Sequence, residues 1–293
     1  MKGVENIKKI KINPRSKIFN LFAGNYRSAF KGIGLEFENI RPYVPGDNVR
    51  YIDWNSTAKS GTVYVKEFTE TRELNIHFAI DNSSSMSLNE WDNKLSKIDL
   101  VINTVYLIGL AANYNYDRIS TSIFSNALEA ITESKRGDSQ LIAILKKIRN
   151  TQKYSYYQEF DLSQYAKFLS EKLNSRTICI IFTDNVDITD KKVLKSLRAL
   201  NIRHEVIIVG LTEYIPANFE FNNTIYLEDI ESGLTEEVDK NSLKDYNEQI
   251  KTNIAQIRLE LGKNNIDYLP ISSESNILKE LIKFFKYRSA KYD

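Results

Sequence analysis

One turn of the sequence groups side chains that could hold a metal ion. The apolar segment at residues 74–80 runs directly into Asp81, and Ser83 and Ser85 follow at alternate positions. This spacing predicts that the turn directs the carboxylate and both hydroxyl groups toward one point. Oxygen ligands of this kind suit a hard divalent ion, Mg²⁺ above all or Mn²⁺.

A second and a third loop are expected to meet this turn. The apolar segment at residues 177–183 ends at Asp184. Ligands of doubly wound sheets bind beyond the carboxyl ends of the strands, where the strand order reverses, so we expect Asp81 and Asp184 to face each other. Two facing carboxylates repel unless a cation lies between them. Ser139, which opens a predicted helix, is expected to add a hydroxyl ligand directly or through water.

Strand and helix patterns alternate from residue 74 onward, and they must position these groups. Apolar segments predict strands at residues 74–80, 118–125, 127–132, 177–183, 205–211 and 267–272, and helical spacing predicts helices at residues 98–112, 191–200 and 242–261 among others. The alternation predicts an α/β fold with a doubly wound, mostly parallel, Rossmann-like sheet over residues 74–293. A β-hairpin insertion is expected at residues 224–239.

The first 73 residues have a different character, and they predict a small β-rich subdomain packed on the edge of the main sheet. A cluster of polar and aromatic residues lies within it, namely Glu36, Arg41, Asp47, Arg50, Asp53 and Trp54. One interpretation is an internal network of salt bridges and hydrogen bonds that fixes the subdomain to the sheet. The other is a docking surface for a partner.

Composition limits the classes of function. The 40 basic and 38 acidic residues leave a net charge of +2, which gives no general argument for binding nucleic acid or a membrane surface. Cys179 is the single cysteine, so no internal disulfide can form, and its apolar neighbours predict a buried side chain. No apolar stretch reaches the roughly 20 residues that a transmembrane helix needs. We therefore expect a cytoplasmic protein.

Two stretches of sequence resemble known families. "DNSSSMS" at residues 81–87 is similar to the first motif of the metal-ion-dependent adhesion site of von Willebrand factor A domains. "GIGLEFENIRPYVPGDNVRYIDWNSTAKSGTVYVKEF" at residues 32–68 resembles the signature of the bacterial family "domain of unknown function 58", and the resemblance extends over about residues 12–290. It implies a von Willebrand A-like fold.

The resemblance also assigns roles to individual residues. Asp81, Ser83 and Ser85 match the first metal motif, and Asp184 matches the third. The second motif usually supplies a threonine, and Ser139 is the nearest match here. Proteins of this kind resemble partners of MoxR-type AAA+ ATPases, which implies a role as an adaptor or in the assembly of other proteins.

The sequence therefore favours a non-enzymatic, metal-dependent module for protein–protein interaction. Its metal ion would bridge to an aspartate or glutamate of a partner protein. The N-terminal segment and the hairpin at residues 224–239 would frame that surface.

Two alternatives stay open. The first is a hydrolase or phosphoryl-transfer enzyme that uses Asp81 and a divalent metal. Enzymes of the haloacid dehalogenase type need a second acid two positions later, where this chain has Ser83, and neither a G-x-S-x-G elbow nor a phosphate-binding loop occurs. His77 and His204 lie in or beside predicted strands and are interpreted as structural. The second alternative is a structural scaffold with an empty metal site.

Overall fold

The computed structural model describes most of the chain. Its described residues are 17–30, 35–70, 73–87, 95–151, 161–184, 186–212, 225–228, 235–238 and 240–292. Within them, helices and strands alternate from Asn75 to the end, as the sequence predicts.

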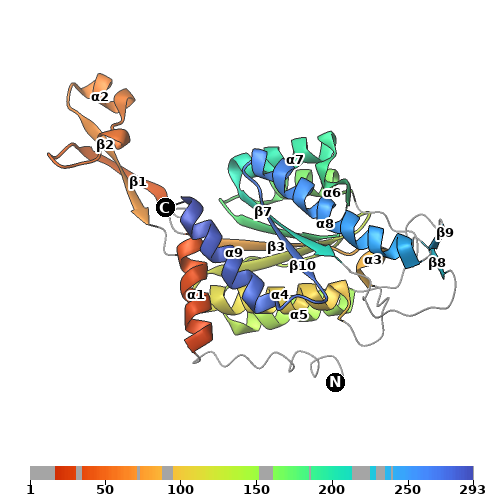
Figure 1. The fold of residues 1–293 in the computed structure, drawn as a ribbon. Helices are drawn as coiled ribbons and strands as arrows, with labels where there is room; N and C mark the ends of the chain where they lie inside the picture. Colours follow the sequence, from red (N-terminus) through yellow and green to blue (C-terminus); the bar gives the residue numbers. More distant parts are fainter. Residues whose placement is uncertain are drawn as a thin grey trace.

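A six-stranded sheet lies at the centre of the described chain (Figure 1). Across the sheet the strands are β10 (Asp267–Ser272), β7 (Glu205–Thr212), β6 (Ile178–Thr183), β3 (Asn75–Asp81), β4 (Arg118–Phe124) and β5 (Leu128–Ile131). Neighbouring strands are parallel except β5, which pairs antiparallel with β4. The predicted doubly wound, mostly parallel α/β sheet is confirmed. Its strand order reverses between β3 and β6, because the chain continues from β3 to one side and later returns to the other.

Helices cover both faces of the sheet. One layer contains α1 (Lys17–Ala29), α4 (Lys97–Tyr114), α5 (Asp138–Thr151) and α9 (Ile277–Tyr292), and the other contains α6 (Leu162–Lys172), α7 (Lys191–Arg203) and α8 (Lys240–Lys263). Successive residues of a strand point to opposite faces. Phe78 of β3 therefore packs in the first layer, while its neighbour Ala79 packs in the second. Cys179 is buried in the second layer, as predicted, and burial raises the pKa of its thiol.

Helix α1 was not anticipated from the sequence. It packs against α9, and Phe22 lies with its ring centroid 5.8 Å from that of Phe285. The Tyr26 hydroxyl donates to the Asp117 carboxylate at 2.7 Å, and both side chains are buried. The N-terminal part of the chain thus contributes a helix to the core of the main sheet. The division of the chain at residue 73 stays a prediction.

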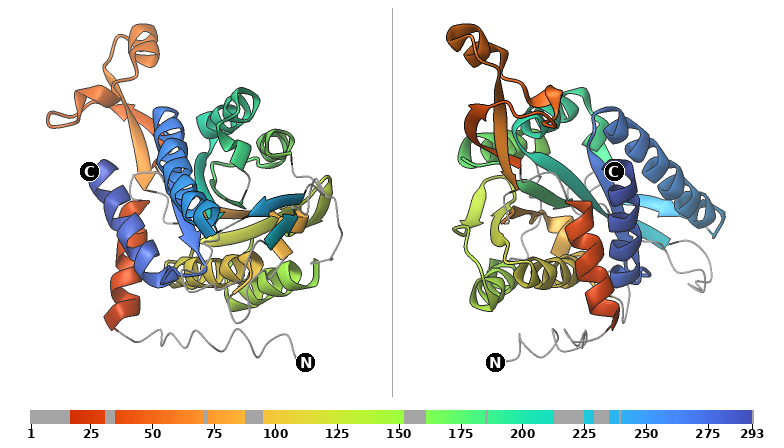
Figure 2. Two further views of the ribbon diagram at one scale, coloured as in Figure 1. Left: turned by 45° about the vertical axis from the view of Figure 1, so that its right-hand side comes forward. Right: turned by 90° about the vertical axis from the view of Figure 1, so that its left-hand side faces the viewer.

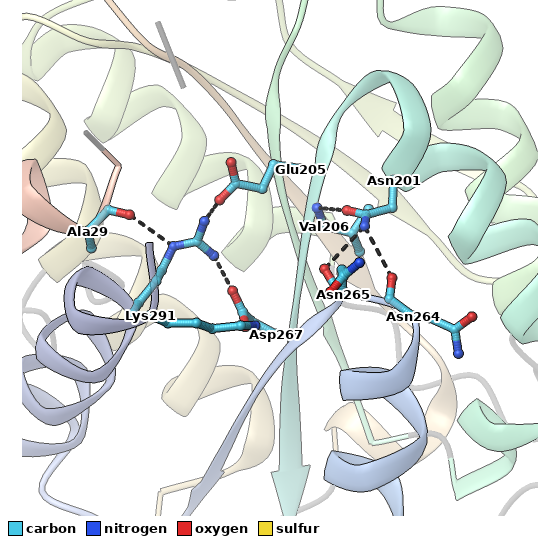
Figure 3. Close-up of polar contacts among 9 residues, drawn as sticks. Ala29, Asn201, Glu205, Val206, Asn264, Asn265, Asp267 and Lys291 are labelled. Carbon is cyan, nitrogen blue, oxygen red and sulfur yellow. Dashed lines mark hydrogen bonds and ion pairs between the residues drawn. The ribbon is translucent and has the colours of Figure 1, made fainter. Parts of the chain in front are cut away.

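A buried arginine joins the two terminal helices to the sheet. Arg288 of α9 is 1% exposed, donates to the Ala29 carbonyl at 3.1 Å, and forms ion pairs with Glu205 and Asp267. Lys291 also reaches Asp267, at 2.9 Å. Figure 3 shows Ala29, Glu205, Asp267 and Lys291 gathered at this point. Glu205 and Asp267 begin their strands, so the cluster marks the amino end of the sheet.

A hairpin that we call the arm stands away from the sheet. It consists of β1 (Leu35–Pro42) and β2 (Tyr64–Glu70), which pair antiparallel, with the short helices η2 (Val49–Tyr51) and α2 (Trp54–Ser60) between them. Figures 1 and 2 show the arm projecting from the molecule instead of packing along an edge of the main sheet. The expectation that this β-rich part packs on the sheet edge was therefore wrong. The arm leads into β3 and so lies at the amino end of the sheet.

The remaining described elements are short. They are α3 (Ser84–Ser87), η3 (Val186–Thr189), β8 (Ile225–Glu228) and β9 (Thr235–Val238). β8 and β9 pair antiparallel inside the segment where a hairpin was expected, and the turn between them lies outside the described residues. Among the described residues, every helix is too short or too polar to cross a membrane.

Truncating a buried side chain of α1 should test whether this helix belongs to the core. Phe22→Ala should lower the free energy of unfolding by about 3–5 kcal/mol, because it removes a fully buried ring and leaves a cavity. Leu21→Ala is the matched control, since Leu21 on the same helix is 52% exposed, and it should cost about 0.5 kcal/mol or less. Urea unfolding of both variants measures the difference. Equal losses would contradict the packing of α1.

Candidate functional site

The two predicted aspartates meet at the carboxyl end of the sheet. β3 and β6 pair in parallel with Ile80 beside Phe182, so both strands end at the same level. The hydroxyl of Thr183, the last residue of β6, donates to Asp81 Oδ2 at 2.6 Å. Asp184 follows at once. The expectation that the loops after these two strands converge is met by this pairing.

The turn after β3 gathers its polar groups as the spacing predicts. The backbone N–H of Ser83 donates to Asp81 Oδ1 at 2.8 Å, which closes the turn over the carboxylate. The hydroxyl oxygens of Ser83 and Ser85 lie 3.2 Å apart. Asp81 and Ser83 are buried, Ser85 is half-buried, and the buried Met86 fixes the turn to the core. Ser85 is thus the member of the turn nearest to solvent.

A lysine that the sequence analysis did not identify completes this edge. Lys97, the first residue of α4, places its ammonium nitrogen 2.7 Å from Asp184 Oδ2. The two side chains are only 12% and 11% exposed, so the pair is largely shielded from water. The sequence carries one signal that could have identified Lys97. A cation in the first turn of a helix is unfavourable beside the positive end of the helix dipole and therefore needs a local partner.

The charges at this edge affect each other. Burial, and next the nearby Asp184 carboxylate, raise the pKa of Asp81 to about 8. Hydrogen bonds from Thr183 and Ser83 act in the opposite direction and do not outweigh burial. Without a metal ion, Asp81 therefore retains a proton near neutral pH, whereas Lys97 is available to balance the charge of Asp184.

Ser139 lies at the wrong end of the sheet to be a ligand. Because β5 runs antiparallel to β4, it returns the chain to the amino end before α5 begins. The Gln140 side chain, one residue after Ser139, donates to the Ile119 carbonyl at 3.1 Å. Ile119 pairs with Ile76, five residues before Asp81 and thus roughly 17 Å away along the strand. The assignment of Ser139 to the metal site was therefore wrong.

The other end of α5 reaches the site instead. The Asn82 side chain donates to the carbonyl of Thr151, the last residue of α5, at 3.3 Å and to Glu129 at 3.0 Å. Residues 152–160, which continue from this point, lie outside the described residues. The described ranges contain no group of three or more His, Cys, Asp or Glu side chains placed to hold a metal ion. The described donor set is therefore two carboxylates and two hydroxyl groups.

This donor set fits a hard divalent ion. Carboxylate and hydroxyl oxygens are ligands that Mg²⁺ accepts, with water completing its octahedron. Adjacent ligands of an octahedron with bonds of 2.0–2.1 Å lie about 3 Å apart. The separation of 3.2 Å between the Ser83 and Ser85 hydroxyl oxygens is close to that spacing.

The histidine beneath the site is part of the core. His77 is 2% exposed and lies between the hydroxyls of Ser120, at 2.9 Å, and Ser122, at 2.6 Å. The Tyr165 hydroxyl adjoins Ser122 at 2.6 Å. Burial, with a smaller contribution from His204, lowers the pKa of His77 to about 3, so the ring is neutral. Burial on all sides agrees with the structural interpretation of His77.

The polar cluster of the N-terminal segment is divided in the structure. Arg41 binds Asp47 through two hydrogen bonds of 2.7 and 2.8 Å and reaches Glu67 at 3.3 Å. The hydrogen bonds from Arg41, and next from the Val44 backbone, lower the pKa of Asp47 to about 2. These contacts join residues of the arm to each other, so this part of the cluster does not fix the arm to the sheet.

Among the described side chains of the cluster, Arg50, Asp53 and Trp54 do not join the contacts of Arg41 with Asp47 and Glu67. Asp53 caps α2 by accepting from the backbone N–H groups of Asn55 and Ser56. Arg50 is exposed, and Trp54 at the tip of the arm is 70% exposed. The side chain of Glu36 lies outside the described residues.

Removing the Asp81 carboxylate should change how stability depends on pH. The folded chain holds the Asp81 proton up to about pH 8, whereas an ordinary aspartate loses it near 3.8. The folded state thus binds more protons between these values, and metal-free wild type should lose stability as the pH rises from 4 to 8, by up to about tenfold in the unfolding constant per pH unit. Asp81→Asn should flatten this loss.

Denaturant unfolding in EDTA at several pH values measures the effect. Asp161→Asn is the matched control, because Asp161 caps α6 and its pKa is lowered, so it does not titrate in this window. Identical slopes in wild type and Asp81→Asn would contradict a protonated Asp81.

Three comparisons describe what this chain is similar to. An uncharacterized protein of Mycobacterium tuberculosis is 21% identical over 284 residues, which are 96% of this chain and 88% of the relative. The crystal structure of the conserved hypothetical protein BatB from Bacteroides thetaiotaomicron is 14% identical, with a TM-score of 0.47 over 74% of this chain and 99% of that one. The VWA domain of SpRpn10 is 8% identical, with a TM-score of 0.39 over 72% of this chain and 94% of that one.

The TM-scores of these two structures are below 0.5, so neither structure supports an argument about the fold. The fold class of this chain is therefore assigned from its own sheet. The described sheet has six strands, all parallel except β5, and its strand order reverses between β3 and β6, which makes it a doubly wound, mostly parallel α/β sheet. A family model matches residues 39–258, from β1 to α8. The chain therefore belongs to the family described as "Protein of unknown function DUF58".

Proposed function

We propose that this protein is a non-enzymatic module for protein–protein interaction that holds Mg²⁺, or Mn²⁺, at the carboxyl end of its sheet. The observation that carries the proposal is the convergence of Asp81, Ser83, Ser85 and Asp184 from two neighbouring strands. A loop assembled on two central strands is held rigidly, as a binding site requires.

The described residues would leave the ion partly coordinated. Two carboxylates balance the charge of a divalent ion, and two hydroxyl groups bring the protein ligands to four, whereas Mg²⁺ takes six. Ser85 is half-buried, so part of its surface is accessible to solvent. An aspartate or glutamate of a partner protein could bind there, and the bound ion would supply the attraction for its carboxylate.

A MoxR-type AAA+ ATPase is the partner that we propose. The proposal rests on the resemblance of residues 32–68 described in the sequence analysis, which implies partners of this kind, and the family match over residues 39–258 is consistent with that resemblance. In this role the chain would act as an adaptor or assembly factor.

The tip of the arm is a proposed second contact. Trp54, Val49 and Arg50 are exposed there. Large exposed aromatic side chains and arginine are common at the energetic centres of interfaces. Since the arm lies at the amino end of the sheet, this surface is separate from the metal site.

Calorimetric titration with Mg²⁺ and Mn²⁺ tests the site. Wild type should bind one ion, and Asp81→Asn should weaken binding by about tenfold or more, because one of two charged ligands becomes neutral. Asp161→Asn, which removes a carboxylate at the cap of α6, should bind as wild type does. Capture of a purified MoxR-type ATPase should then require the ion and be lost in EDTA. Capture that is equal in EDTA and in Mg²⁺ would overturn metal dependence.

A further inference from the structure

The position of Lys97 is not explained by the helix that it begins. It is the first residue of α4, directly after the Ser96 cap. The first turn of a helix presents backbone N–H groups and the positive end of the dipole, which disfavour a cation. The Lys97 side chain is nevertheless held with only 12% of its surface exposed. A contact outside the helix must therefore favour lysine at this position.

That contact is with a residue of the candidate site. The Lys97 ammonium is 2.7 Å from Asp184 Oδ2 and crosses from α4 to the end of β6. The nearest acid on the same helix, Asp99, accepts from the Ser96 hydroxyl at 2.8 Å and pairs with Arg149 at 2.9 Å. Asp184 is thus a carboxylate outside the helix that pairs with Lys97.

A metal ion and this ammonium would meet at the same carboxylate. An ion bound to Asp184 Oδ2 at about 2.1 Å would lie within about 4.8 Å of the Lys97 nitrogen, because that nitrogen is 2.7 Å from the same oxygen. Two cations this close repel strongly when water is largely excluded. Lysine has a long flexible stem, so its ammonium can withdraw from the carboxylate.

We propose that the Lys97 ammonium and a divalent ion are alternative counter-cations of Asp184, so that Lys97 determines how readily the site takes up metal. The inference rests on the metal site of the proposed function and extends it. In the metal-free chain, Lys97 balances the acid. Uptake of an ion must displace Lys97, and this displacement lowers the affinity for the ion.

Lys97→Met tests the competition, because methionine keeps an unbranched apolar stem and lacks the charge. In protein cleared of metal with EDTA, this variant should bind Mn²⁺ and Mg²⁺ at least about tenfold more tightly than wild type by calorimetry. Its unfolding temperature should also rise more on addition of Mg²⁺. Lys283→Met is the matched control, since Lys283 forms a surface pair with Glu280 at 2.8 Å and is 60% exposed. It should behave as wild type does.

The outcomes separate this inference from the proposed function. Equal ion affinity in wild type and Lys97→Met would overturn the competition and leave the metal site standing. If Lys97→Met binds the ion and wild type does not, the result would support competition between Lys97 and the ion for Asp184. The same result would refute metal dependence of the wild-type protein. Absence of binding in both would overturn both.

A second measurement does not depend on the stability of a variant. In wild type, the side-chain NMR resonances of Lys97 should shift as Mg²⁺ is added, because the ammonium leaves Asp184. Lys283 resonances should stay in place. Unchanged Lys97 resonances at saturating Mg²⁺ would overturn the inference. A Lys97→Gln variant that binds the ion with the affinity of wild type would also overturn it.

Discussion

The parallel pairing of β3 and β6 is the constraint on which the site depends. It brings the ends of two apolar strands to one level and thereby places Asp81 beside Thr183 and Asp184. Hydrophobic burial holds both strands in the centre of the sheet, so neither carboxylate can move away from the other without disturbing the core. Two neighbouring carboxyl groups that are largely shielded from water need a proton or a cation to neutralise their charge.

The metal-free edge satisfies this requirement with its own groups. Burial raises the pKa of Asp81 to about 8, so its carboxyl group is neutral, and Lys97 balances Asp184. In the proposed metal-bound state both acids would be ionised and Lys97 displaced. Ion uptake would therefore release the Asp81 proton and break the shielded ion pair between Lys97 and Asp184. The affinity for the ion would depend on the pH and on the strength of that ion pair.

Local patterns predicted the part of the site that depends on local structure. The turn from Asp81 to Ser85 is contiguous, and the contacts that gather Asp81, Ser83 and Ser85 lie within it, so its spacing was sufficient to identify it. Ser139 was misplaced because the direction of β5 decides at which end α5 begins, and direction depends on pairing between strands. Lys97 was missed because its partner lies 87 residues away in the sequence. Helix α1 carries a local signal, because its buried residues Phe19, Phe22 and Tyr26 recur at steps of three and four. It was missed because the first 73 residues were interpreted as β-rich.

The separation of the two candidate surfaces bears on the adaptor proposal. β3 begins next to the arm and ends at Asp81, and its seven residues span roughly 20 Å. Between the two surfaces lies a rigid sheet, whose amino end is held to both terminal helices by the buried Arg288. One short peptide could not contact both the tip of the arm and the candidate metal site. Two partners, or one large partner, would have to do so, and a rigid body with a contact at each end suits a protein that holds others in a fixed arrangement.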